Sequence, residues 1–185
     1  MTKKSINQAY ALGLAIMGLV AAAPASAALS NHGDSRVVFK AVGPAGLSFE
    51  GKGRDVRLRE QGSAVVVSVR LDDLTTGIEL RDRHMKEKYL ETNKYPTATL
   101  EVDKSKLQFP QGNSVSGSAD ARLTLHGVTR PVKITYRADG DSKQAKVDGS
   151  MRVNMKDFKI EVPSYLGVTV KPNVDVEVKL GVVNK

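Results

Sequence analysis

Strict alternation of apolar and polar residues limits this chain to a small set of folds. The pattern is plainest near the end of the sequence, where residues from Val174 to Val182 alternate between apolar side chains and charged residues or glycine. A period of two places successive side chains on opposite faces of a β-strand. Similar runs recur along the chain, so the sequence predicts a protein built from strands that have one apolar and one polar face.

About nine segments are predicted strands, separated by turn sequences such as Gln61-Gly62 and Asp139-Gly140. They are 36–42, 47–51, 56–60, 64–71, 97–102, 115–125, 132–138, 147–154 and 174–182. Only the segment 80–90 is predicted to be helical, because Met85 and Tyr89 stand four residues apart and most of its other side chains are charged. Tyr165-Leu166-Gly167 is predicted to form a loop over one end of the fold.

Several strands of this kind leave two architectures, a β-sandwich and a closed barrel. Closure removes exposed strand edges, which favours an antiparallel barrel of eight or slightly more strands. We therefore expect an all-β fold, with the short helix at 80–90 lying against an open end of the barrel.

The predicted interior contains small residues and few aromatic rings. Gly117, Ala119, Ala121 and Gly149 contribute almost no volume on long strands. Such an interior is hard to fill to the normal packing density of about 0.75, which indicates a cavity for a long apolar ligand. Small residues also occur where two sheets approach closely or where a barrel bends around a glycine. The pattern alone leaves both interpretations open.

The first 27 residues have the features of a cleavable signal peptide. Lys3 and Lys4 precede an almost uniformly apolar run over 9–23, and Ala25-Ser26-Ala27 matches the small residues read by signal peptidase. The run is about fifteen residues long, shorter than the roughly 20 that span a bilayer, which argues against the alternative of a retained anchor. We expect cleavage after Ala27 and a periplasmic or secreted protein.

The chain has no cysteine, which excludes disulfides, a thiol nucleophile and Cys-ligated zinc.

Several motifs together resemble the YceI-like family. They are 35–39 (SRVVF) with Gly51, 75–85 (TTGIELRDRHM), 94–98 (KYPTA), 123–132 (LTLHGVTRPV) and 158–160 (FKI). The resemblance covers about residues 34–183. It implies a lipocalin-like antiparallel barrel that binds a polyisoprenoid or similar long-chain lipid in a central tunnel, without catalysis and without a cofactor. Many members are exported to the periplasm. The family usually opens with a His-Ser pair, whereas this chain has Gly33-Asp34-Ser35.

With this resemblance, we expect two groups of ligand-binding residues. Arg81 and His84 lie in the matched motif and are candidates to orient a polar head group, although a solvated helix face is an equal alternative. Lys86 and Lys88 are interpreted as solvated. The predicted tunnel wall consists of Phe39, Phe49, Val67, Val69, Met85, Leu123, Leu125, Ile134, Tyr136, Met151, Val153, Val176, Val178 and Leu180.

Histidines at 32, 84 and 126 lack the spacing of a metal site. His126 precedes Gly127 in a predicted turn and is expected to bond to the backbone.

Other function classes remain as alternatives. An enzyme could use His84 with Asp82 or Glu87 as acid–base groups, but the chain has no Gly-x-Ser-x-Gly elbow or phosphate-binding loop. An outer-membrane barrel needs aromatic girdles, and the chain has 5 Tyr, 4 Phe and no Trp.

Nucleic-acid binding is not expected, because charges of both signs are interspersed without an aromatic platform. The net charge of +8 favours transient contact with an anionic membrane surface instead.

Overall fold

The structure, a computed structural model, describes residues 28–43, 46–165 and 168–184. The predicted signal peptide and Leu166 and Gly167 of the predicted loop lie outside the described residues. The strands are β1 (Leu29–Asn31), β2 (Arg36–Val42), β3 (Ser48–Gly53), β4 (Val56–Gln61), β5 (Ala64–Arg70), β6 (Thr97–Asp103), β7 (Ser114–Leu125), β8 (Val128–Gly140), β9 (Gln144–Asn154), β10 (Ser164–Tyr165), β11 (Val168–Thr169) and β12 (Asn173–Asn184). The helical segments are α1 (Glu79–His84), η2 (Met85–Tyr89), η3 (Lys104–Lys106) and η4 (Met155–Phe158).

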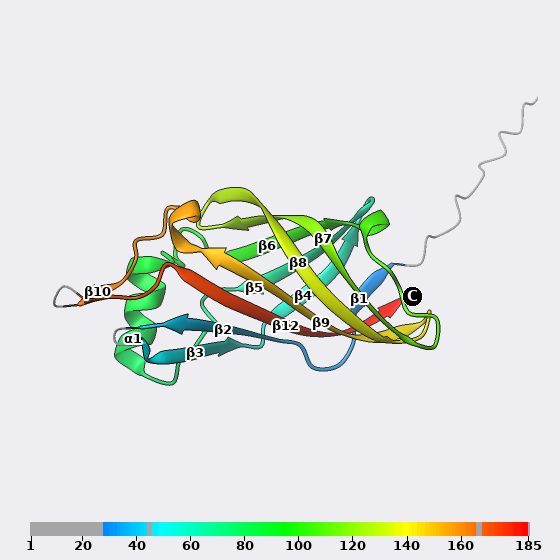
Figure 1. Cartoon of the computed structure of the whole chain (residues 1–185), viewed down its shortest axis with the longest axis horizontal. Coiled ribbons are helices and arrows are strands. Elements are labelled where there is room, and N and C mark those ends of the chain that lie inside the picture. The colour runs from blue at the N-terminus through cyan, green and yellow to red at the C-terminus, as the bar shows by residue number, and fades with distance from the viewer. Residues whose placement is uncertain (1–27, 44–45, 166–167, 185) are drawn as a thin grey trace, which may run out of the picture.

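The main sheet closes into an eight-stranded antiparallel barrel. Its strand order is β1-β4-β5-β6-β7-β8-β9-β12, and a further pairing of β12 with β1 completes the ring. β2 pairs with β12, and β3 pairs with β2. β1 and β2 therefore act together as one bent strand, and β3 and β4 act together as another. Figure 1 shows an elongated barrel with α1 across one end and the C-terminus at the other. The predicted all-β barrel with one short helix is confirmed.

Closure depends on a change of partner along β12. This strand pairs with β2 over Val174 to Lys179 and with β1 over Val182 to Asn184. Gly181 lies between the two stretches, and its carbonyl accepts a hydrogen bond from the His32 N–H at 2.8 Å. A β-carbon at Gly181 would collide with the His32 carbonyl oxygen, so this crossing requires glycine.

The nine predicted strands are all present, with differences at their ends. β8 begins at Val128 instead of 132 and so includes Pro131. β9 pairs with β8 only from Ile134 onward, so Pro131 lies on a stretch of strand with one free edge, where a missing N–H costs little. β1, β10 and β11 were not predicted, since two or three residues are too few to establish a period.

The predicted helix is present but changes its winding. α1 covers Glu79–His84 and continues as a π-helical turn, η2, in which the Leu90 N–H donates to the Met85 carbonyl at 2.8 Å. Met85 and Tyr89 both remain on the side that faces the barrel interior.

Side chains fill the barrel interior beside β7. Ala119 and Ala121 pack with Val102 and Ile134 in a buried cluster. A β-carbon at Gly117 would lie 2.8 Å from the Tyr136 hydroxyl oxygen, so the tyrosine ring occupies the space that this glycine leaves. The sequence argument for a cavity was therefore wrong at these three β7 positions, where small residues permit close packing.

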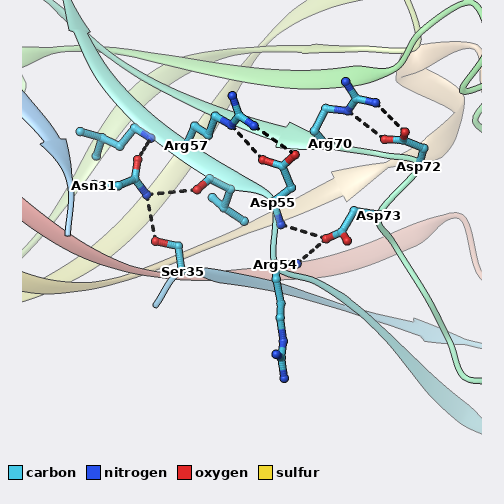
Figure 2. A network of polar contacts seen from close by, with 10 residues as sticks. Asn31, Ser35, Arg54, Asp55, Arg57, Arg70, Asp72 and Asp73 are labelled. Carbon is cyan, nitrogen blue, oxygen red and sulfur yellow. Dashed lines mark hydrogen bonds and ion pairs between the residues drawn. The ribbon is translucent and has the colours of Figure 1, made fainter. Parts of the chain in front are cut away.

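Polar contacts fasten the bends of the two composite strands (Figure 2). The Asn31 side-chain amide donates to Ser35 Oγ at 2.9 Å and to the Val56 carbonyl at 3.1 Å, which joins β1 to the start of β4. Asp73 Oδ2 accepts from the backbone N–H groups of Arg54 at 2.5 Å and Asp55 at 2.9 Å. These bonds hold the segment after β5 against the corner between β3 and β4.

The Asp73 contact makes stability depend on pH. Backbone N–H groups of Asp55 and then Arg54 hold the pKa of this carboxyl below its ordinary value. The ionised form is thus favoured in the folded state, and its contribution is present at neutral pH and lost as pH falls through the lowered pKa. We expect Asp73→Asn to lower the free energy of unfolding by about 0.5–1 kcal/mol at pH 7, discounted for the exposure of the carboxylate.

Urea unfolding at pH 7 and at pH 3 measures this effect. The difference between the wild-type protein and Asp73→Asn should shrink at the lower pH. Asp34→Asn is the matched control, because Asp34 is exposed and takes part in none of the side-chain hydrogen bonds found in the described chain. An Asp73 variant with unchanged stability at both pH values would contradict the assignment.

Candidate functional site

A cavity of about 600 Å³, here called the main cavity, lies inside the barrel at the α1 end. Strands from both sides of the barrel and the α1–η2 segment contribute its walls. Its presence explains an otherwise odd exposure pattern: inward side chains such as Val67, Val69, Val176 and Val178 are only half-buried, although they face the interior of a closed sheet. These residues border open space.

Most of the predicted tunnel residues line the main cavity. They are Phe39, Phe49, Val67, Val69, Arg81, His84, Met85, Leu123, Leu125, Met151, Val153, Val176 and Val178. The other three, Ile134, Tyr136 and Leu180, do not reach it. They line a second apolar cavity of about 140 Å³, here called the inner cavity.

Sequence reasoning missed a further set of main-cavity residues. They include Val37, Ala41, Leu71, Leu74, Thr76, Ile78, Leu80, Tyr89, Leu90, Ala98, Leu100, Ile160, Pro163, Ser164, Val170 and Val174. Alternation with known neighbours could have found Val37, Ala41 and Val174. The loop residues have no such period, because their contact with the cavity depends on how the loops cross the barrel end.

Phe39 owes its position in the cavity wall to a glycine on the neighbouring strand. Phe39 on β2 pairs with Gly51 on β3. A β-carbon at Gly51 would collide with the Phe39 ring, so the ring lies over the glycine backbone. Both residues belong to the motif that was matched at the start of the barrel.

The polar side chains among the described lining residues are few and gather at the helical end: Thr76, Arg81, His84, Tyr89 and Ser164. Arg81 is held in place from two sides. Its Nε donates to Thr76 Oγ1 at 2.7 Å and its Nη2 donates to the Thr76 carbonyl at 3.0 Å. Its guanidinium carbon lies 4.7 Å from the centre of the Phe49 ring, within cation–π range. A fixed cation therefore stands at the rim of an apolar cavity.

Asp82 does not form an acid–base pair with His84. Its Oδ2 accepts from Thr75 Oγ1 at 2.6 Å and its Oδ1 accepts from the Thr76 N–H at 2.7 Å. Burial alone would raise the pKa of Asp82, but the bonds from Thr75 and Thr76 outweigh it and hold the pKa below its ordinary value. No hydrogen bond within the described chain joins Asp82 to His84. Asp82 serves to fix the turn before α1.

His126 forms the predicted backbone contact and one more. Its Nδ1 lies 3.2 Å from the Phe158 carbonyl oxygen, and its Nε2 lies 2.8 Å from Glu91 Oε2. Lys94 and then His126 lower the pKa of the Glu91 carboxyl. Both partners of the imidazole are oxygen atoms of neighbouring segments. The contact ties the end of the helical segment to the turn between β7 and β8.

No cluster of metal-binding side chains occurs among the residues described. Within the same residues, no helix has the length and apolar character needed to span a bilayer.

The sequence model of the YceI-like domain matches residues 30–182. The chain belongs to the YceI-like family. A relative in Pseudomonas savastanoi pv. phaseolicola, a UPF0312 protein, is 28% identical over 192 residues, which span 96% of this chain and 97% of the relative.

Two solved structures share the YceI-like fold of this chain. The polyisoprenoid-binding domain from Saccharophagus degradans, implicated in plant cell wall breakdown, superposes with a TM-score of 0.71 at 16% identity, covering 86% of this chain and 99% of that domain. Burkholderia cenocepacia BcnA superposes with a TM-score of 0.63 at 13% identity, covering 80% of this chain and 95% of BcnA. At these identities the similarity shows the fold.

Proposed function

We propose that this chain is an exported, non-catalytic binding protein that holds a long-chain isoprenoid or similar lipid in the main cavity. The apolar cavity of about 600 Å³ inside the barrel carries the proposal. Each methylene group moved from water into such a space gains about 0.8 kcal/mol, so the cavity favours long hydrocarbon chains over small polar solutes. The polyisoprenoid-binding neighbour supports the choice of ligand class, and the signal-like features of residues 1–27 support export.

The absence of catalysis in this proposal is supported by the geometry at Asp82. Of the two carboxylates considered as partners of His84, Asp82 is instead hydrogen-bonded to Thr75 and Thr76. A lowered pKa also makes Asp82 a weak base at neutral pH.

Lipid occupancy of the main cavity is tested by Val69→Gln. Val69 lines the main cavity and is half-buried, so a glutamine amide there places an unpaired polar group against the lipid chain. We expect about tenfold weaker binding of an isoprenoid alcohol, since burying such a group without a partner costs about 1–3 kcal/mol. Native mass spectrometry of freshly purified protein, with extraction of bound lipid, measures the occupancy.

The matched control is Arg70→Gln, one residue along β5. Arg70 is exposed and pairs with Asp72 on the outer face, where an exposed ion pair contributes little. Equal occupancy in Val69→Gln and the wild-type protein, or repeated recovery of empty wild-type protein, would contradict the proposal.

The orientation of the ligand is tested by Arg81→Ala. The guanidinium at the cavity rim offers charge-assisted hydrogen bonds to a phosphate head group. We therefore expect this variant to lose about tenfold or more in affinity for a prenyl phosphate and little for the corresponding alcohol, in parallel binding titrations. Arg83→Ala is the control, because Arg83 is an exposed residue of α1 outside the described cavity lining. Unchanged head-group selectivity in Arg81→Ala would argue against this orientation.

Contact with an anionic membrane surface is also part of the proposal. Leu47, Ile78 and Leu80 are 73%, 53% and 54% exposed, and Ile78 and Leu80 line the main cavity. Cleavage after Ala27 would remove Lys3 and Lys4 and leave 26 basic and 20 acidic residues, a net charge of +6, which together with these side chains favours a negatively charged bilayer. Binding to vesicles should rise with anionic lipid content and fall in the double variant Ile78→Ser, Leu80→Ser. Binding that is independent of anionic lipid content would contradict membrane contact.

A further inference from the structure

The two apolar cavities adjoin one another along the barrel. Five residues line both of them: Val67, Leu100, Met151, Val176 and Val178. We call this group the waist. Met151 on β9 pairs directly with Val176 on β12, so these two residues lie side by side in the wall where the cavities adjoin. Met151 is the most adaptable member, because its unbranched side chain has three rotatable bonds.

The inner cavity lies on the far side of the waist from Arg81 and His84. The segment after η3, from Leu107 to Pro110, contributes to its wall. The Gln108 N–H donates to the Tyr136 hydroxyl at 2.7 Å, which anchors this segment to β8. The hydroxyl oxygen of Tyr136 is thereby engaged, and the remaining lining is almost entirely apolar. The inner cavity therefore suits the end of a hydrocarbon chain and not a head group.

The size of the inner cavity depends on how Tyr136 lies between two glycines. In the strand register, Tyr136 is paired with Gly117 on β7 and with Gly149 on β9. Its ring covers Gly117, where a β-carbon would be 2.8 Å from the hydroxyl oxygen. At Gly149 a β-carbon would meet only the Val178 carbonyl oxygen, at 4.0 Å. The space beside Gly149 is open, and Gly149 lines the inner cavity.

We propose that the inner cavity is a terminal subsite for the far end of the lipid chain, and that Met151 and Gly149 set the longest chain that the protein accepts. The inference rests on the proposed lipid-binding function and adds a chain-length specificity to it. A short isoprenoid is accommodated in the main cavity alone. A longer chain passes the waist and places its end beside Gly149, where any larger residue would shorten the available path.

Gly149→Leu tests the subsite in the full chain, with farnesol as the short probe and solanesol as the long probe. The substitution fills the inner cavity without a predicted backbone clash. We expect about tenfold weaker binding of solanesol, in line with the loss of a few buried methylene contacts, and unchanged binding of farnesol. Asp148→Leu is the matched control, because it places the same side chain on the exposed outer face of β9.

Met151→Ala provides a second, opposite variant in case Gly149→Leu folds poorly. Widening the waist should raise the affinity for solanesol relative to farnesol, and circular dichroism reports whether each variant is folded. Equal losses for both probes in Gly149→Leu, or unchanged binding of solanesol, would overturn the terminal subsite while leaving the lipid-binding proposal intact. Failure of the wild-type protein to bind either probe would overturn the proposed function, and this inference with it.

Discussion

Closure of the sheet along β12 is the constraint on which the rest of the structure depends. One edge of this strand pairs first with β2 and then with β1, and Gly181 allows the crossing between them. An eight-stranded ring has an interior only slightly wider than its own side chains. Small differences in residue size therefore decide whether each level is filled or hollow. The Tyr136 ring fills the space over its strand partner Gly117, whereas the valines on β5 and β12 border the main cavity.

The helical segment turns this hollow barrel into a site with two different ends. Thr75 pairs with Lys52 of β3 through two backbone hydrogen bonds of 2.8 Å, and at the other end of the segment Glu91 contacts His126. With both ends attached, Met85 faces the main cavity and Arg81 stands at its rim. The polar groups lie at one end and the inner cavity at the other, so the two ends of the barrel interior differ in polarity.

Much of the fold could be predicted because alternation reports which face of a strand is buried. The nine strand segments followed from it, and the helix near 80–90 followed from the four-residue spacing of Met85 and Tyr89. Alternation does not report register, and register decided the interior. It paired Gly117 with Tyr136 and Gly51 with Phe39, so one ring filled a predicted void and another became cavity wall. It also assigned Ile134, Tyr136 and Leu180 to the inner cavity.

The sequence by itself determined that this chain forms strands with one apolar face, that few large rings fill its interior, and that its basic motif residues lie on one short helix. These properties are local, since each depends on residues that are neighbours along the chain. The tertiary structure alone decided that Arg81 stacks on Phe49 and that two cavities meet at Met151. Such contacts depend on distances across the barrel, which are established only when the last strand closes the ring.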